Sequence, residues 1–309
     1  MSREKNFCLV TGAGGFLGSH LCSYLIDKGN TVIGVSRKEG FLSPEVLDHP
    51  NFFFIKGDMM DISSVNLAQI NNPIDVIFHL ASQQPSSAGI GYEDFYRGNV
   101  MTTQKVIEWA QEMGVGMIVY TSTIAVFGDR RGIVDEETCV SPNTYYAITK
   151  YVGERLLYMF TKERSGARVV IFRLPSVFGK NHLGGIVHTI SSLAKENKTI
   201  ELFSKGQIKK PLISYKTVLD SLYTAWMRGD SLPDFEVFLL ADYPTLVLKE
   251  VAEVIVESMG SDSPILLSER QSVARGDMVP DTTKARTLLG LEGRDVREAL
   301  RDYVREVWL

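Results

Sequence analysis

Two tyrosine–lysine pairs with the same spacing stand in one predicted helix, which covers residues 143–164. Tyr146 and Lys150 are four residues apart, and so are Tyr158 and Lys162. Residues with this spacing share one face of a helix. A lysine ammonium group beside a phenol lowers the pKa of the phenol from about 10, which makes proton transfer feasible near neutral pH. The sequence therefore offers two candidate acid/base pairs.

The position of each pair in the helix separates them. Ligands of a parallel sheet bind beyond the carboxyl ends of its strands, where the following helices begin. Tyr146 lies in the first turn or so of the helix, whereas Tyr158 is roughly 18 Å further along. We therefore interpret Tyr146 and Lys150 as catalytic and Tyr158 as structural. The preceding strand ends in Thr121-Ser122-Thr123, so a hydroxyl at that edge could bind a substrate oxygen beside Tyr146.

The elements that must position these residues follow a regular alternation in the first half of the chain. Strands are expected at 6–12, 31–35, 52–58, 75–81, 116–123 and 168–174, and helices at 16–29, 62–70, 94–114 and 143–164. The strands are rich in Val, Ile and Phe without polar alternation, which is typical of a parallel sheet buried on both faces. The pattern predicts an α/β fold with a Rossmann-type doubly wound parallel sheet.

The regular alternation of strands and helices ends after residue 175. Helices are expected at 186–198, 218–229, 246–260 and 297–308, and one strand at 235–241. We expect an NAD(P)-binding Rossmann domain over residues 1–175. Residues 176–309 then form mainly a smaller α/β substrate lobe, from which the strand near 235–241 returns to the Rossmann sheet.

A glycine-rich loop, Thr11-Gly12-Ala13-Gly14-Gly15-Phe16-Leu17-Gly18, joins the first predicted strand to the first helix. Gly12 permits the tight turn, Gly15 lets backbone N–H groups approach a pyrophosphate, and Gly18 lets the helix pack closely on the strand. The helix N-terminus adds partial positive charge. This context predicts a dinucleotide site. At the end of the third strand, Asp58-Met59 could contact an adenine, the alternative being an ordinary turn aspartate.

The second strand ends in Ser36-Arg37-Lys38, where NAD-binding proteins carry an acidic residue for the ribose 2′-hydroxyl. Serine can donate a hydrogen bond to a 2′-phosphate, and arginine can pair with it through two N–H groups. The triplet therefore predicts NADP(H), with NAD as the alternative cofactor. Taken alone, these residues could equally form a solvated turn.

The composition excludes several other classes of protein. Hydrophobic residues make up 44% of the chain, charged residues 23%, and the formal net charge is -4, which gives no general attraction to nucleic acid or anionic membranes. No apolar run approaches the roughly 18 residues of a membrane helix. We expect no signal peptide, because the N-terminal residues lead directly into a predicted strand, and three cysteines without metal-like spacing suit a reducing cytoplasm. We expect a cytoplasmic protein without a metal.

Several ordered motifs resemble the extended short-chain dehydrogenase/reductases, the NAD(P)-dependent nucleotide-sugar epimerase/dehydratase/reductase family. The segment "TGAGGFLGSHL" is similar to the opening of that family, and "DVIFHLAS" to its HLA segment. Further along, "GNVMTT", "YTSTIAVFG", "SPNTYYAITKYVGE", "RLPSVFGK" and "RGDMVPDTTKARTLLG" follow in the order that the family shows. The resemblance spans nearly the whole chain.

The resemblance implies roles for individual residues. Tyr146 would be the catalytic acid/base, Lys150 would tune it and bind ribose, Thr123 would supply the catalytic hydroxyl, and Asn99 would be more structural than catalytic. The expected cofactor-binding residues are Gly12, Gly14, Gly15, Phe16, Leu17, Gly18, Ser36, Arg37, Lys38, Asp58, Met59, Leu80, Ala81, Ser82, Asn99, Thr121, Tyr146, Lys150, Leu174, Pro175 and Val177. The expected contacts of a nucleotide-sugar substrate are Ser82, Gln83, Thr123, Ser176, His182, Lys210 and Arg275. The resemblance also implies a homodimer formed through helices 94–114 and 143–164.

The departures from the family pattern narrow the chemistry. Ile124 and Ala125 stand where 4,6-dehydratases carry an Asp-Glu pair, and neither can transfer a proton. Ala125 also replaces the cysteine of reductases that epimerise neighbouring carbons. Ser176 replaces an asparagine that contacts substrate, and Lys210 stands where an arginine often holds the nucleotide. Arg275 is one place out of register with a phosphate-contacting arginine.

Three functions fit these residues. An NADPH-dependent reductase would convert a keto nucleotide sugar, most simply a 4-keto sugar, to an alcohol, with Tyr146 as the proton donor. An epimerase would hold NAD, oxidise a sugar carbon and reduce its other face. A cofactor-binding sensor without turnover is the third, and it needs no tuned phenol. Because Ser36-Arg37-Lys38 indicates NADPH, the sequence favours the reductase, with the epimerase as the alternative.

Overall fold

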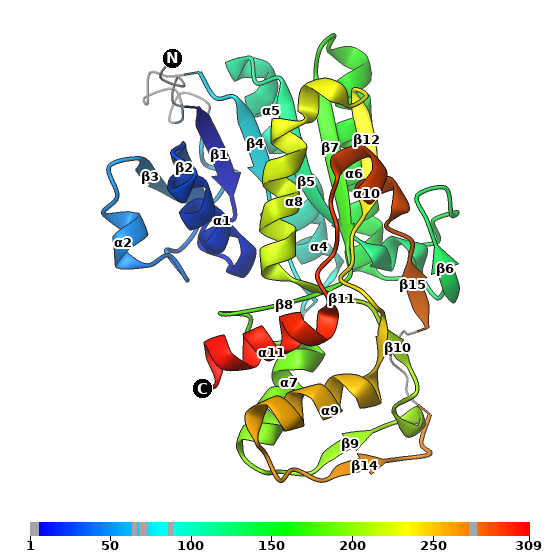
Figure 1. The fold of residues 1–309 in the computed structure, drawn as a ribbon. Helices are drawn as coiled ribbons and strands as arrows, with labels where there is room; N and C mark the ends of the chain where they lie inside the picture. The colour runs from blue at the N-terminus through cyan, green and yellow to red at the C-terminus, as the bar shows by residue number, and fades with distance from the viewer. Residues whose placement is uncertain (1–5, 64–66, 68–72, 86–88, 272–276) are drawn as a thin grey trace. The chain divides into compact units, whose positions relative to one another are not determined.

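The computed structural model describes residues 6–63, 67, 73–85, 89–271 and 277–309 (Figure 1). Among them, seven strands form one sheet in the order β12-β7-β5-β4-β1-β2-β3. The strands are β1 (Phe7–Thr11), β2 (Thr31–Ser36), β3 (Phe52–Lys56), β4 (Val76–His79), β5 (Met117–Thr123), β7 (Arg168–Leu174) and β12 (Phe235–Leu239). The pairs β1–β2, β1–β4, β2–β3 and β4–β5 are parallel. This order, which reverses at β1, confirms the predicted doubly wound fold.

Helices cover both faces of this sheet (Figure 1). They are α1 (Phe16–Asp27), α2 (Pro44–Leu47), α4 (Tyr92–Phe95), α5 (Thr102–Met113), α6 (Tyr145–Glu163) and α8 (Tyr215–Met227). The strands send one set of side chains into a core with α5 and α6, in which Trp109 and Phe160 are fully buried. On the other face, the Tyr24 hydroxyl of α1 donates to Asp220 of α8 over 2.7 Å. The central strands lack polar alternation because they are buried on both faces of the sheet.

The helix that the sequence predicts at 94–114 is divided. The π-helix η1 (Tyr96–Met101) lies between α4 and α5. Such wide turns often occur at functional sites. Here the turn contains Asn99, which is 1% exposed. An apolar periodicity does not reveal a single wide turn, so this feature could not be predicted from the sequence. The helix predicted at 62–70 falls mostly outside the described residues.

The chain forms two compact units. The first comprises residues 1–126, 142–173 and 219–238, and the second comprises 127–141, 174–218 and 239–309. The units therefore alternate along the chain. Assigning cofactor binding to residues 1–175 and substrate binding to 176–309 stays a prediction.

The second unit combines helices with short strands. Its helices are α7 (Gly185–Lys195), α9 (Leu248–Met259), α10 (Thr283–Leu289) and α11 (Val296–Val307). Its strands are β6 (Gly132–Val134), β8 (Ser176–Phe178), β9 (Ile200–Leu202), β10 (Lys209–Lys210), β11 (Leu212–Ser214), β13 (Leu246–Val247), β14 (Ile265–Leu267) and β15 (Met278–Pro280). They pair two by two: β10–β13, β8–β11, β9–β14 and β6–β15. Two- or three-residue strands are too short to show a period, which explains why the sequence analysis missed them.

Short 3-10 turns complete the chain. They are η2 (Ile124–Phe127), η3 (Ser204–Gly206) and η4 (Gly229–Ser231). Within the described residues, the structure contains no helix with the length and apolar character needed to cross a membrane.

A buried ion pair joins α6 to the sheet in the first unit. Arg173 of β7 donates to both carboxylate oxygens of Glu154, from Nε over 3.1 Å and from Nη2 over 2.8 Å. The Ser122 hydroxyl of β5 donates to the same carboxylate over 2.5 Å. The Arg173 and Glu154 side chains are 7% and 2% exposed. Such a pair is costly to break, since the surviving charge stays buried without its partner.

We therefore expect Arg173→Met and Glu154→Leu each to lower the free energy of unfolding by about 3–5 kcal/mol. The double variant should lose clearly less than the sum, because no uncompensated charge is left. Urea unfolding of the four proteins measures the cycle. Additive losses would show that the two side chains do not depend on each other.

Candidate active site

The glycine loop is built so tightly that a Cβ at Gly12, Gly14 or Gly18 would clash with backbone atoms. Gly12 has φ of +73°, and a Cβ there would lie 2.9 Å from the Ala81 nitrogen. A Cβ on Gly18 would lie 2.1 Å from the Gly12 oxygen, and one on Gly14 would lie 2.0 Å from the Lys38 oxygen. The loop is further held by a 2.9 Å hydrogen bond from the Gly12 nitrogen to the Val35 oxygen. This bare backbone fits a pyrophosphate that must approach its N–H groups closely.

The helix that follows leaves its N-terminus available for an anion. Helix α1 begins at Phe16 with Gly15 as its N-cap, has no side-chain cap and carries no acidic residue in its first turn. Leu17 and Gly18 belong to this turn. The first N–H groups of a helix have no partner within it and carry partial positive charge. The observed geometry therefore suits the phosphates of a dinucleotide.

The end of β2 lies against the glycine loop. Beyond Ser36, the chain turns at Gly40, which has φ of +59°, and the Phe41 nitrogen donates to the Gly14 oxygen over 3.1 Å. Arg37 and Lys38 are exposed. The predicted phosphate-binding triplet thus stands beside the dinucleotide loop. Contact of these side chains with a cofactor stays a prediction.

Asp58 is held by two partners at the end of β3. Its carboxylate accepts from the Met60 nitrogen over 3.0 Å and pairs with Arg97 over 3.1 Å. These contacts, mainly the one from Met60, lower the pKa of Asp58, and the nearby charge of Arg37 lowers it further. Met59 is 6% exposed and packs in the core with α5 and α6. A contact of Asp58 or Met59 with adenine stays a prediction.

Asn99 organises the loop that follows β4. Its Oδ1 accepts from Ser82 Oγ over 2.9 Å and from the Gln83 nitrogen over 2.8 Å, while its Nδ2 donates to Thr149 Oγ1 over 2.9 Å. The amide therefore ties this loop to α6. Leu80 and Ala81 come directly before Ser82 in this loop, and the Ala81 nitrogen donates to Thr11 Oγ1 over 3.2 Å. Asn99 thus holds Ser82 and Gln83 in place through hydrogen bonds, and its structural rather than catalytic role stays a prediction.

The hydroxyls at the end of β5 serve different partners. Neighbouring side chains of a strand point to opposite sides. Ser122 Oγ is taken by Glu154, whereas Thr123 forms a hydrogen bond with Tyr146 and also accepts from the Ala125 nitrogen over 3.1 Å. Thr121 is buried, 3.5 Å from the His79 oxygen. This arrangement supports the choice of Thr123 as the hydroxyl that works with Tyr146.

Tyr146 and Lys150 lie in the first turns of α6, which begins at Tyr145 with Thr144 as its N-cap. Burial lowers the pKa of Lys150 to about 7, while the Glu154 carboxylate opposes this change. Burial raises the pKa of Tyr146 more than hydrogen bonds with Gln84 and Thr123 lower it. The expected fall in the phenol pKa is therefore not found. Tyr146 is therefore protonated at neutral pH, and it needs a nearby positive charge before it can act as a base.

The second tyrosine of α6 has other surroundings. Arg155 and Lys162 lie over the Tyr158 ring, 4.5 Å and 5.2 Å from its centroid, and Phe235 packs against it edge-on at 5.1 Å. The ring thus has cationic and aromatic neighbours but no catalytic hydroxyl among these contacts. The structural interpretation of Tyr158 accords with this packing.

The remaining predicted contacts belong to the second unit, except that Arg275 lies outside the described residues. Leu174 and Pro175 are buried, whereas Ser176 and Val177 are half-buried in β8. Burial lowers the pKa of Lys210 in β10 and, with the charge of His188, the pKa of His182. The binding roles of these residues stay predictions.

Three site residues escaped the sequence analysis. Gln84 follows the predicted Gln83 and forms a hydrogen bond with Tyr146. Glu154 is four residues beyond Lys150, and this repeated spacing could have indicated it. Arg97 pairs with Asp58, but residues so distant in sequence carry no local signal. Among the described residues, no group of three or more His, Cys, Asp and Glu side chains could hold a metal ion.

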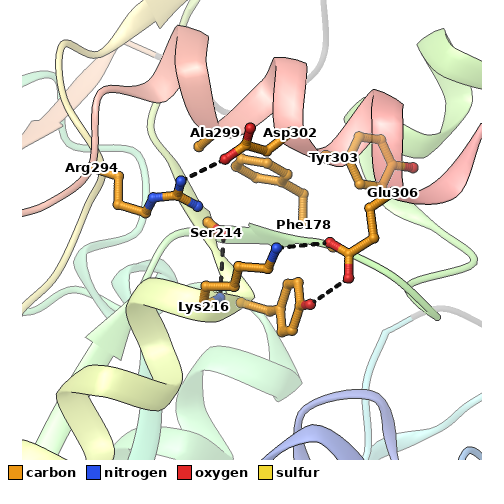
Figure 2. A pocket seen from close by; sticks show the side chains of 10 residues that line it. Phe178, Ser214, Lys216, Arg294, Ala299, Asp302, Tyr303 and Glu306 are labelled. Carbon is orange, nitrogen blue, oxygen red and sulfur yellow. Dashed lines mark hydrogen bonds and ion pairs between the residues drawn. The ribbon is translucent and has the colours of Figure 1, made fainter. Parts of the chain in front are cut away.

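A separate hollow in the second unit lies beside α11 (Figure 2). Arg294 pairs with Asp302 over 2.6 Å, and Lys216 with Glu306 over 3.1 Å. The Tyr215 hydroxyl also donates to Glu306 over 2.8 Å. Each cation faces a carboxylate, so the hollow has no excess charge for a phosphate. We interpret this hollow as part of the contact between α11 and the start of α8, which ion pairs hold together.

Comparisons with known proteins place this site in context. The model of the NAD dependent epimerase/dehydratase family matches residues 8–241. The chain is 29% identical over 296 residues to an uncharacterized UDP-glucose epimerase, YtcB, of Bacillus subtilis, with 91% of each chain covered. It is 27% identical to a dTDP-glucose 4,6-dehydratase of Streptomyces niveus, covering 93% of this chain and 88% of the relative.

A solved structure shares the fold. It is UDP-glucuronic acid 4-epimerase from Bacillus cereus in complex with UDP-glucuronic acid and NAD, with a TM-score of 0.82 and 23% identity. The similarity covers 97% of this chain and 99% of that one. The glycine loop, the Tyr-x-x-x-Lys helix and the family match agree, and the chain belongs to the NAD dependent epimerase/dehydratase family.

Proposed function

We propose that this protein is a nicotinamide-dependent epimerase of a nucleotide sugar, with a UDP-linked hexose or hexuronic acid as the substrate class. The observation that carries the proposal is the place of the Thr123 hydroxyl, at the end of β5, beside the phenol of Tyr146 at the start of α6, in the unit that also holds the glycine loop. Relatives named as epimerases support this function over the reductase that the sequence favoured.

The residues that would hold the cofactor are those of the glycine loop and the α1 N-terminus, with Asp58 and Lys150. A bound nicotinamide would accept a hydride from the sugar and return it. Tyr146 would exchange the hydroxyl proton of the reacting carbon, and Thr123 would orient the same oxygen. Lys150 in its charged form would favour the phenolate that takes up this proton. If the sugar rotates between the two hydride transfers, the second transfer reaches its other face, and the configuration at the reacting carbon is inverted.

The residues after the catalytic hydroxyl argue against a dehydratase. Ile124 and Ala125 begin the 3-10 turn η2, and only the backbone nitrogen of Ala125 takes part in a hydrogen bond with Thr123. Elimination of water needs a side chain that gives or takes a proton. Neither residue has one, although a dehydratase is among the relatives.

The proposal is tested by incubating the purified protein with UDP-glucose, UDP-galactose and UDP-glucuronic acid, and analysing the sugars by NMR. We expect an epimer to form without net consumption of cofactor. Tyr146→Phe should lower kcat at least about 100-fold, because proton transfer by a positioned side chain contributes 10²–10⁴-fold.

Tyr158→Phe is the matched control, since it removes the same hydroxyl from the same helix away from the glycine loop. It should keep most of the activity. Equal losses in the two variants would refute the choice of Tyr146. Consumption of one NADPH for each keto sugar, without epimerisation of the UDP-sugars, would show the reductase instead.

The reductase stays the second candidate on one observation, the exposed Arg37 at the end of β2 beside the glycine loop. If Arg37 binds a 2′-phosphate, Arg37→Ala should weaken NADPH binding about tenfold or more and leave NADH binding nearly unchanged, since hydrogen bonds between charged groups contribute about 1.5–3 kcal/mol. Calorimetric titration measures both affinities.

Arg37→Lys serves as the control for charge. It keeps the positive charge but loses the planar pair of donors, and its affinity for NADPH should lie between those of the other two proteins. NADH binding that equals or exceeds NADPH binding, with no effect of Arg37→Ala, would instead assign NAD to the site.

A further inference from the structure

Tyr120 lies in the interior between the catalytic lysine and a histidine. The Lys150 Nζ atom is 4.0 Å from the centroid of the Tyr120 ring. The His79 ring stacks on the Tyr120 ring at 5.2 Å with an interplanar angle of 23°. Tyr120 and His79 are fully buried, and Lys150 is 2% exposed. A cation within about 6 Å of an aromatic centroid is attracted to the ring face, and more strongly where water is excluded.

The contacts of His79 place a proton on Nε2 and accommodate a neutral ring. Thr103 Oγ1 donates its one proton to the Asn99 oxygen over 2.6 Å, so it must accept from His79 Nε2 at 3.0 Å. On the other side, Thr11 Oγ1 accepts from the Ala81 nitrogen and forms a 2.8 Å hydrogen bond with His79 Nδ1. Burial and the charge of Lys150 hold the pKa of His79 well below its usual value. The ring therefore places no competing cation against Tyr120.

Helix α6 is fitted to the same tyrosine. A Cβ on Gly153 would lie 2.7 Å from the Tyr120 hydroxyl and 3.2 Å from Thr103 Oγ1. Only a glycine lets the helix lie this close, three residues beyond Lys150. Among the described residues, the Tyr120 hydroxyl has no hydrogen-bond partner of good geometry, although Thr103 is beside it. The ring, rather than the hydroxyl, therefore accounts for the contact with Lys150.

The other groups around Lys150 do not make the stabilisation of its ammonium group by the Tyr120 ring unnecessary. Glu154 of α6 opposes the fall in the lysine pKa, but its carboxylate is bound by Arg173 of β7 and by Ser122. Tyr146 is protonated and neutral, and so is Tyr120, whose pKa is raised by burial. Burial still lowers the pKa of Lys150 to about 7, so a modest extra attraction decides its charge at neutral pH.

We propose that Tyr120 is a positioning residue, whose ring face holds the ammonium group of Lys150 in its buried place. The consequence for catalysis rests on the proposed function, in which the charged lysine favours the phenolate of Tyr146. The contact itself does not depend on which substrate is used.

The test measures the protonation of Lys150 by NMR in the full-length protein labelled with ¹³C at lysine Cε, its signal assigned through its loss in Lys150→Met. Tyr120→Phe keeps the ring and should leave the midpoint of the Lys150 titration within a few tenths of a pH unit. Tyr120→Leu removes the ring face and should move the midpoint down by about one pH unit. A group with a lower pKa loses its charge at lower pH, so the alkaline loss of turnover should move down equally.

A second series of variants keeps an aromatic ring of nearly the same shape at position 120 and changes only its electron density. Phenylalanine carrying one, two or three fluorine atoms at position 120 withdraws electron density from the ring face, so the Lys150 midpoint should fall stepwise. This series decides the question if the leucine variant does not fold. Tyr158→Leu is the matched control, because its ring also contacts two cations, and it should leave Lys150 unchanged.

A Lys150 midpoint that stays constant across the fluorinated series would overturn the proposal, as would an equal shift in Tyr158→Leu. The outcome is separate from that of the proposed function. If the unmodified protein epimerises no nucleotide sugar, that function fails, while the titration of Lys150 still reports on Tyr120.

Discussion

The buried charge of Lys150 is the constraint to which the rest of the site is adapted. An ammonium group taken out of water loses its charge unless other groups compensate. The compensation comes from one carboxylate, Glu154, on the same helix face, and from the ring of Tyr120 on the neighbouring strand. Glu154 is itself buried and needs Arg173 and Ser122. The ion pair between α6 and β7 therefore follows from the requirement for a buried lysine.

The alternation of side chains along β5 distributes these tasks. Tyr120 and Ser122 point to the same side of the strand, and both meet α6, one at Lys150 and the other at Glu154. Thr123 points away from them and reaches Tyr146 at the beginning of the helix. Strand β5 thus supplies both Tyr120, which contacts Lys150, and Thr123, which lies beside Tyr146. A shift of one residue in its register would exchange the two sets.

The sequence predicted those features that follow from local rules. The strand–loop–helix around Gly12 and the spacing of Tyr146 and Lys150 need only a few consecutive residues, and they located the glycine loop between β1 and α1 and the start of α6. The wide turn around Asn99 and the contact of Tyr120 with His79 depend on packing between segments far apart in the chain. Burial also reversed the expected pKa change of Tyr146, because spacing alone says nothing of desolvation.

The type of reaction and the choice of cofactor depend on different parts of the site, so a preference for NADP does not imply a reductase. The residues at the end of β2 can contact only the adenosine ribose, which carries a 2′-hydroxyl in NAD and a 2′-phosphate in NADP. The hydride transfer takes place at the nicotinamide, at the other end of the cofactor. Arg37 could therefore select NADP without deciding whether the cofactor is consumed or recycled. Its charge is also shared with Asp58, whose pKa it lowers. The triplet Ser36-Arg37-Lys38 therefore does not by itself indicate a reductase. The relatives bear on the reaction itself and favour epimerisation.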